Sequence, residues 1–118
     1  MATSPLGPSV HEILQERAGR DPAFAGALLS EAVELMLEGE LPAARTIISD
    51  IIKGSIGYAE LSRRTGTAKT SLIRMFGPSG NPTVANLSRV LRELLRHGRV
   101  RLRVRVEQRM GSSRYDEL

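Results

Sequence analysis

The stretch SIGYAELSRRTGTAKTSLIRMFGPSGNPT, residues 55–83, determines the fold that we expect for this chain. Apolar residues recur at helical spacing on both sides of Gly66, and the loop GPSGNP follows them. Glycine permits the unusual backbone angles of a sharp turn, and the hydroxyl of Thr67 is placed to act as the N-cap of the second helix. The stretch therefore predicts a helix, a tight turn, a second short helix and a loop.

The second of these helices, residues 68–76, has two different faces. At about 100° per residue, the side that can pack holds Ala68, Leu72, Met75 and Phe76. The side that can face a partner holds Lys69, Thr70, Ile73 and Arg74. In the first helix the inward stripe consists of Leu61, Ser62 and Thr65, with Tyr58 beside them. This order is that of a helix-turn-helix, although an ordinary helical hairpin gives the same pattern.

Helical patterns also occupy the chain on both sides of this motif. Ser9 with Glu12 has the spacing of a capping box, and Asp21 before Pro22 is an N-cap with proline at the first helical position. Pro42 begins a further helix that ends at Gly54, and Thr83 caps a last one that ends at Gly98. We expect an all-α domain of about six helices over residues 9–107, with disordered tails at 1–8 and 108–118.

After Gly98 the spacing of the apolar residues changes from the helical period of about 3.6 residues to a period of about 2. Four apolar residues alternate with arginines there: Val100, Leu102, Val104 and Val106. The alternation predicts one C-terminal β-strand, whose backbone needs a partner. That partner is the same strand of a second subunit or the sheet edge of another protein. A short, solvated edge strand is the alternative.

Charge is unevenly distributed along the 118 residues, whose formal net charge is +4. Residues 1–42 carry two arginines and seven acidic residues, whereas the remainder carries fifteen basic and six acidic residues. The basic portion contains residues 68–76, the helix with a side that can face a partner; we call it the reading helix. A domain that binds a polyanion requires positive charge near such a helix. A basic surface that is merely solvated remains the alternative reading.

Several function classes lack support in the sequence. There is no cysteine, and His11 and His97 have no second ligand at metal spacing, so we expect no metal site. GPSGNP lacks the Lys-Ser/Thr pair of a phosphate loop, and no catalytic residues or cofactor can be proposed. No run of about 18 apolar residues or signal-peptide pattern occurs, so we expect a cytoplasmic protein that does not enter membranes.

The residues LSRRTGTAKTSLIRMF followed by GNPTVANLSRVLREL resemble the Xre-type helix-turn-helix. More narrowly, residues 20–106 resemble the HigA-like addiction-module antidote proteins, which are antitoxins. The resemblance implies a homodimer that binds operator DNA, represses its own operon and sequesters a RelE/ParE-like toxin. A stand-alone Xre-type regulator, or an interaction adaptor that does not bind DNA, is the alternative.

The resemblance also assigns site residues by position. Tyr58 stands where many members of the family have a phosphate-contacting glutamine, and Ile73 stands where antidote proteins often carry tyrosine. The expected DNA-binding residues are Tyr58, Thr67, Lys69, Thr70, Ser71, Ile73, Arg74, Ser79 and Asn81. Ser79 and Asn81 are expected to offer backbone N–H groups to phosphate. Ile73 is expected to meet a thymine methyl or to be covered by the loop after it.

Overall fold

The computed structural model describes residues 9–109, and these contain six helices and no β-strand. The helices are α1 (Val10–Arg20), α2 (Pro22–Leu37), α3 (Leu41–Gly54), α4 (Tyr58–Thr65), α5 (Lys69–Met75) and α6 (Val84–Gly98). The prediction of an all-α domain with about six helices is confirmed. The predicted tails lie outside the described residues, except that 108 and 109 are described and belong to no helix.

Polar side chains define where three of the helices begin. The Ser9 hydroxyl accepts the Glu12 N–H at 3.1 Å, and the Thr83 hydroxyl accepts the Asn86 N–H at 3.1 Å. The carboxylate of Asp21 accepts the Phe24 N–H at 3.2 Å ahead of α2. Each bond satisfies a backbone donor that has no partner within its helix. All three caps are the ones that the sequence predicts.

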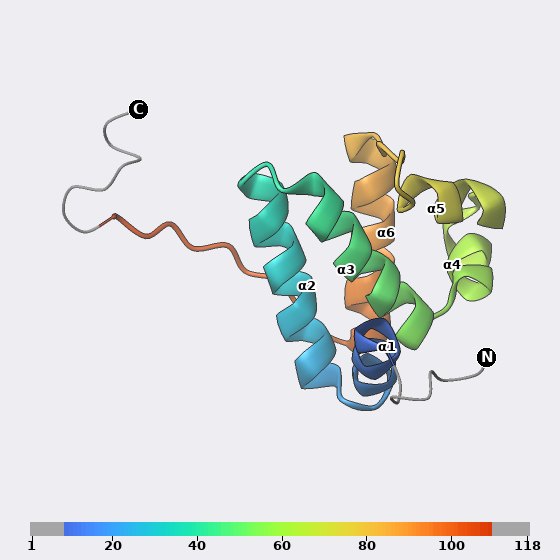
Figure 1. Ribbon diagram of the computed structural model, residues 1–118, viewed down its shortest axis with the longest axis horizontal. Coiled ribbons are helices and arrows are strands. Elements are labelled where there is room, and N and C mark those ends of the chain that lie inside the picture. The colour runs from blue at the N-terminus through green and yellow to red at the C-terminus, as the bar shows by residue number, and fades with distance from the viewer. Residues whose placement is uncertain (1–8, 110–118) are drawn as a thin grey trace.

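The helices form two neighbouring groups (Figure 1). Helices α2 and α3 lie side by side in opposite directions, and α1 packs across them at one end. Helices α4 and α5 lie on the other side of the molecule, with α6 between the groups. Fully buried residues from both groups share one core: Ala32, Ile48, Ile52, Leu61, Leu72 and Val90. The helix-turn-helix is therefore fixed to the N-terminal helices through a common interior.

Two glycines allow α1 and α3 to approach each other very closely. A Cβ on Gly54 would lie 2.1 Å from the Gln15 carbonyl oxygen, and one on Gly19 would lie 2.3 Å from the Gly54 carbonyl oxygen. Both neighbours are backbone atoms, which cannot turn away as a side chain can. Any larger residue at either position would separate the two helices.

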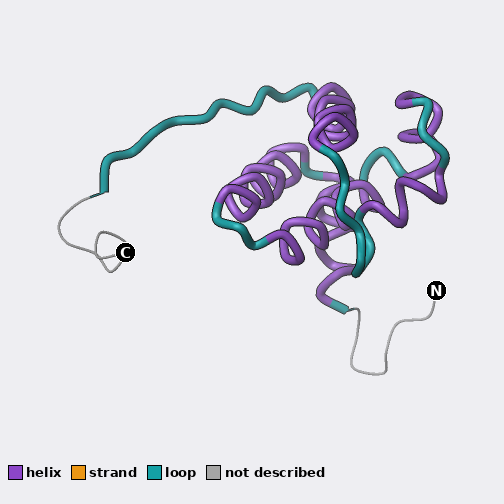
Figure 2. Tube along the Cα trace, turned by 90° about the horizontal axis from the view of Figure 1, so that it is seen from above, coloured by secondary structure: helices purple, strands orange, loops and turns teal. Residues whose placement is uncertain are grey.

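The predicted C-terminal strand is absent from the described residues, and that prediction is wrong for this chain by itself. After α6 the backbone turns at Arg99, whose φ is 54°, and continues as a loop that leaves the body of the molecule (Figure 2). Val104 is 73% exposed and Val106 is 95% exposed. An isolated extended segment has no neighbouring chain to accept or donate ladder hydrogen bonds, so alternation alone does not make it a strand.

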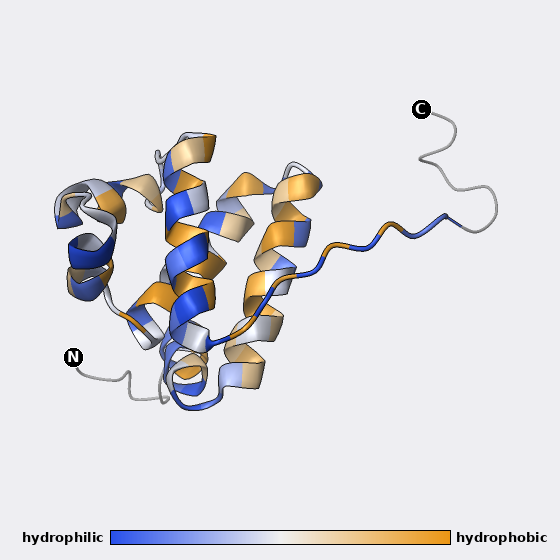
Figure 3. Ribbon diagram, turned by 180° about the vertical axis from the view of Figure 1, so that it is seen from behind, coloured by the Kyte–Doolittle hydropathy of each residue, from blue (hydrophilic) through white to orange (hydrophobic). Residues whose placement is uncertain are grey.

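Helix α6 is strongly two-sided. Val90 and Leu94 are buried, whereas a polar face follows the helix after its first turn when the molecule is seen from behind (Figure 3). No helix in the described part of the chain is both long and apolar enough to cross a membrane.

Candidate nucleic-acid interface

The turn between α4 and α5 is held by short-range hydrogen bonds. Gly66 has a φ of 74° and ends α4, as the sequence predicts. The Ser62 hydroxyl donates to the Thr67 carbonyl oxygen at 2.6 Å, and the Thr67 N–H donates to the Thr65 hydroxyl at 3.3 Å. These bonds fix the direction in which α5 leaves the turn.

The predicted N-cap of α5 is wrong by one residue. The helix begins at Lys69 and its N-cap is Ala68, which makes no side-chain cap bond. The backbone N–H and carbonyl groups of Thr67 both take part in the turn, so Thr67 belongs to the turn and precedes the helix by one further residue. Ala68 is exposed, although it was predicted on the inward side. Helix α5 is also shorter than the predicted range 68–76.

The remaining residues of α5 separate as predicted. Leu72 is 0% exposed and Met75 is 9% exposed, with Phe76 buried just beyond them. The outward side chains are all exposed: Lys69, Thr70, Ser71, Ile73 and Arg74. The inward side anchors the helix, and the outward side displays two cations, two hydroxyls and one branched apolar group.

The loop of residues 77–83 packs against the end of α5. A Cβ on Gly80 would lie 2.1 Å from the Met75 carbonyl oxygen, so only glycine fits there without movement. Arg45 of α3 donates to the Gly80 carbonyl oxygen at 2.8 Å and to the Pro78 carbonyl oxygen at 3.1 Å. The loop is thereby tied both to α5 and to the N-terminal helices.

This loop brings several predicted site residues together. A shallow depression of about 270 Å³ is lined by side chains of α5, the loop and the start of α6, among them Ser71, Arg74, Ser79, Asn81 and Thr83. Ile73 lines a different groove with Gly77 and Pro78 and remains 46% exposed, so the loop does not cover it. Ile73 is therefore accessible to a partner.

Two predicted residues are occupied within the protein. Tyr58 is 8% exposed and its hydroxyl lies 2.8 Å from that of Ser49, and burial raises the pKa of Tyr58. Thr67 takes part in the turn described above. We therefore assign the Tyr58 side chain and the Thr67 backbone to the scaffold that holds α5 in place.

Arg45 was missed by the sequence reasoning. It precedes the loop by more than thirty positions, and a lone arginine beside an apolar stripe does not indicate its partner.

The buried carboxylate of Asp50 was missed for the same reason. It accepts a bond from Gln15 at 2.9 Å and lies 2.6 Å from Nδ1 of His11, and so joins α1 to α3.

A carboxylate also lies between two cations on α4. Glu60 pairs with Arg63 and, at 2.8 Å, with Arg64. Hydrogen bonds from Arg63 and then from Arg64 lower the pKa of Glu60 to about 2 and raise the pKa of Arg63. Glu60 is ionised at neutral pH and compensates part of the positive charge on this helix.

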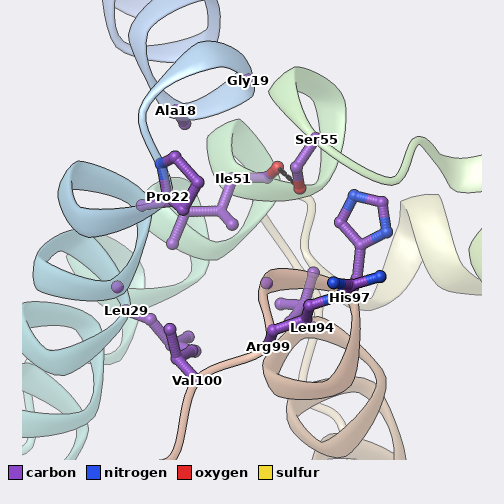
Figure 4. Close-up of a pocket in the computed structure, with 13 residues that line it drawn as sticks. Ala18, Gly19, Pro22, Leu29, Ile51, Ser55, Leu94, His97, Arg99 and Val100 are labelled. Carbon is purple, nitrogen blue, oxygen red and sulfur yellow. Dashed lines mark hydrogen bonds between the residues drawn. The ribbon is translucent and has the colours of Figure 1, made fainter.

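A separate pocket of about 190 Å³ lies between α1, α2, α3 and α6 (Figure 4). Its walls include Ala18, Leu29, Ile51 and Leu94, and His97 is the only imidazole on its lining. Among residues 9–109, no three His, Cys, Asp or Glu side chains are grouped so that they could hold a metal ion. The pocket offers no acid and base pair that could perform catalysis.

Comparison with protein-family models, with curated proteins and with solved structures finds no match to this chain.

Proposed function

We propose that this protein is a sequence-specific DNA-binding repressor that inserts α5 into the major groove. One observation carries the proposal: α5 buries one side in the shared core and displays Lys69, Thr70, Ser71, Ile73 and Arg74 on the other. A short, rigidly anchored helix with exposed donors is the element that reads base edges in helix-turn-helix proteins. The net positive charge of residues 43–118 supports the same partner.

Each outward group has a chemical counterpart on a duplex. Arg74 and Lys69 bind guanine edges or phosphates, and Thr70 and Ser71 bind bases or backbone oxygens. Ile73 meets a thymine methyl. Ser79 and Asn81 are exposed on the loop beside Arg74, where they can reach a phosphate next to the base contacts.

The repressor acts as a homodimer on a palindromic site in this proposal. Two copies of α5 then meet two half-sites about 34–36 Å apart. The resemblance to antidote proteins extends the proposal to a cytoplasmic, autoregulating antitoxin that binds a RelE/ParE-like toxin. In such an assembly, residues 100–106 can gain the strand partner that the single chain lacks.

One observation favours a protein-binding role in addition. Glu31 and Glu34 of α2 and its C-cap Glu38 are exposed, and none of them has an ionic partner within residues 9–109. A basic protein such as a toxin ribonuclease fits an acidic surface of this kind. If this role stands alone, the chain is an adaptor without DNA affinity.

The test uses the DNA directly upstream of the gene, because an autoregulator binds its own promoter. Binding through about six phosphates should weaken roughly a thousandfold between about 50 and 200 mM salt. Arg74→Ala should cost about 1–3 kcal/mol on this DNA and relax one base position. Unchanged affinity in a gel-shift titration would remove Arg74 from the interface, and no salt-dependent binding would reject the DNA-binding function.

A further inference from the structure

A second basic surface lies outside the α5 interface. Residues 84–106 contain seven arginines and a single acidic residue, Glu93. We define the α6 stripe as Arg89, Arg92, Arg96 and Arg99. The arm arginines that follow it are Arg101, Arg103 and Arg105. None of these residues belongs to the reading helix or to its loop.

The α6 stripe is one continuous face. At about 100° per residue, Arg89, Arg92 and Arg96 fall within an arc of about 60°, opposite the buried Val90 and Leu94, and Arg99 follows at the end of the helix. All four are exposed. Seen from behind, the polar face of α6 runs along the helix and the arm leaves from its end (Figure 3). The stripe and the arm therefore present positive charge over a long, unbroken path.

Little of this charge is compensated within the protein. Arg96 lies 3.4 Å from Glu93, and Arg105 lies 3.6 Å from Glu107 in an exposed pair. Arg89 donates only to the neutral amide oxygen of Asn86, at 2.9 Å. Within residues 9–109, five of the seven have no ionic partner: Arg89, Arg92, Arg99, Arg101 and Arg103. A row of like charges without partners favours binding of a polyanion.

The chemistry of the stripe distinguishes a duplex from a protein partner. Protein interfaces depend on buried apolar or aromatic anchors at their centre. The exposed face of α6 offers only Val84, in its first turn, as a large apolar group. Guanidinium groups pair with phosphate oxygens through two parallel hydrogen bonds and keep their charge at every accessible pH. In the arm the arginines alternate with Val100, Leu102, Val104 and Val106, and all three arm arginines are exposed.

We propose that the α6 stripe and the arm arginines bind the phosphate backbone of double-stranded DNA without reading its sequence. The arm leaves the molecule on the side away from α4 and α5 (Figure 1). A duplex seated on α5 therefore leaves this surface available for DNA that flanks the operator or for a second duplex. This goes beyond the proposed function, because it requires no recognised base sequence.

The experiment measures binding of the full chain to a duplex of random sequence, about 30 base pairs long, by fluorescence anisotropy over a range of salt. In the variant Arg89→Gln/Arg92→Gln/Arg96→Gln, the slope of log K against log salt should fall by about 0.9 per lost phosphate contact, to a maximum of about 2.7. Affinity at low salt should fall tenfold or more. The variant Arg101→Gln/Arg103→Gln/Arg105→Gln tests the arm in the same way.

A matched pair of single variants controls for general loss of charge. Arg92→Gln should lower the salt slope by about 0.9, whereas Arg20→Gln, which changes an exposed residue at the end of α1, should leave it unchanged. The affected side chains are exposed, so thermal unfolding should not change. Arg74→Ala should alter discrimination between the upstream DNA and the random duplex while the stripe variants preserve that ratio.

Two results would overturn the proposal. An unchanged salt slope in both triple variants would show that the arginines do not contact phosphates. Tighter binding of poly-L-glutamate than of the duplex at equal salt would assign the surface to an acidic protein. Failure of Arg74→Ala to change discrimination would reject the reading role of α5 and leave the stripe result standing.

Discussion

The N-terminal helices and the helix-turn-helix are held together by different means. Contact between α1 and α3 depends on groups far apart in sequence: Gly19 against Gly54, and Asp50 with Gln15 and His11. The turn between α4 and α5 depends on groups within five positions of one another, such as Ser62 and Thr67. The first region is a scaffold fixed by close approach of backbones, and the second is a locally determined unit that rests on it.

Gly54→Ala tests the close contact between α1 and α3, and we expect it to have the largest effect. A Cβ there meets backbone atoms of α1, so we expect a loss of stability of about 1–3 kcal/mol or more in urea denaturation. Gly26→Ala in α2 is the matched control, because nothing lies within 4 Å of its added Cβ. That control should gain up to about 1 kcal/mol from helix propensity. Equal effects of the two changes would contradict the close contact.

Arg45 links the two regions, and Arg45→Met tests the link. Losing two hydrogen bonds to loop carbonyls should cost about 1–2 kcal/mol, reduced because the arginine is part exposed. Binding to the upstream DNA should also weaken, since the loop carries Ser79 and Asn81 beside Arg74. Arg20→Met removes an exposed arginine elsewhere and should change neither quantity. DNA affinity that survives Arg45→Met intact would show that the loop does not need α3.

A smaller effect is expected at Arg99, where α6 ends in a left-handed backbone conformation. Glycine adopts these angles without strain, so Arg99→Gly should stabilise the protein by about 0.5–1 kcal/mol. Arg99→Ala removes the same side chain and keeps the strain, so it should bring no gain. The melting temperatures of the two variants measure the difference, and a gain in both would attribute it to charge instead.

The smallest effect concerns Glu60, whose pairing is local to α4. Its folded pKa of about 2 is below the ordinary 4.5, so its stabilisation is present above pH 4.5 and is lost as pH falls toward 2. The melting temperature of Glu60→Gln should be slightly below that of the unaltered protein near neutral pH, and the gap should close through this range. A gap that is constant with pH would mean that the carboxylate charge is not responsible.

The same contrast explains what could be predicted from the sequence. Caps at Ser9, Asp21 and Thr83, the turn at Gly66 and, apart from Ala68, the faces of α5 follow from neighbours within a few positions, and the structure agrees with each. The N-cap of α5 was misplaced by one residue because the turn extends through Thr67, whose backbone bonds to Ser62 and Thr65. The burial of Tyr58 and the partners of Arg45 and Asp50 required knowledge of how distant helices meet. The C-terminal strand was predicted from a period that defines two faces but supplies no neighbouring chain.

The exposed side chains of α5 contribute nothing to the core that holds the helix in place. Substitutions at Lys69, Thr70 or Ile73 should therefore be almost neutral for folding while they alter the surface that is offered to a partner. Such a helix can acquire a new target through single changes, each of which leaves a viable protein. Gly80 and Arg45 are constrained by their contacts with the backbone, so substitutions there should destabilise the protein. Duplicated copies of this gene can therefore diverge in the exposed residues of α5 while Gly80 and Arg45 are kept.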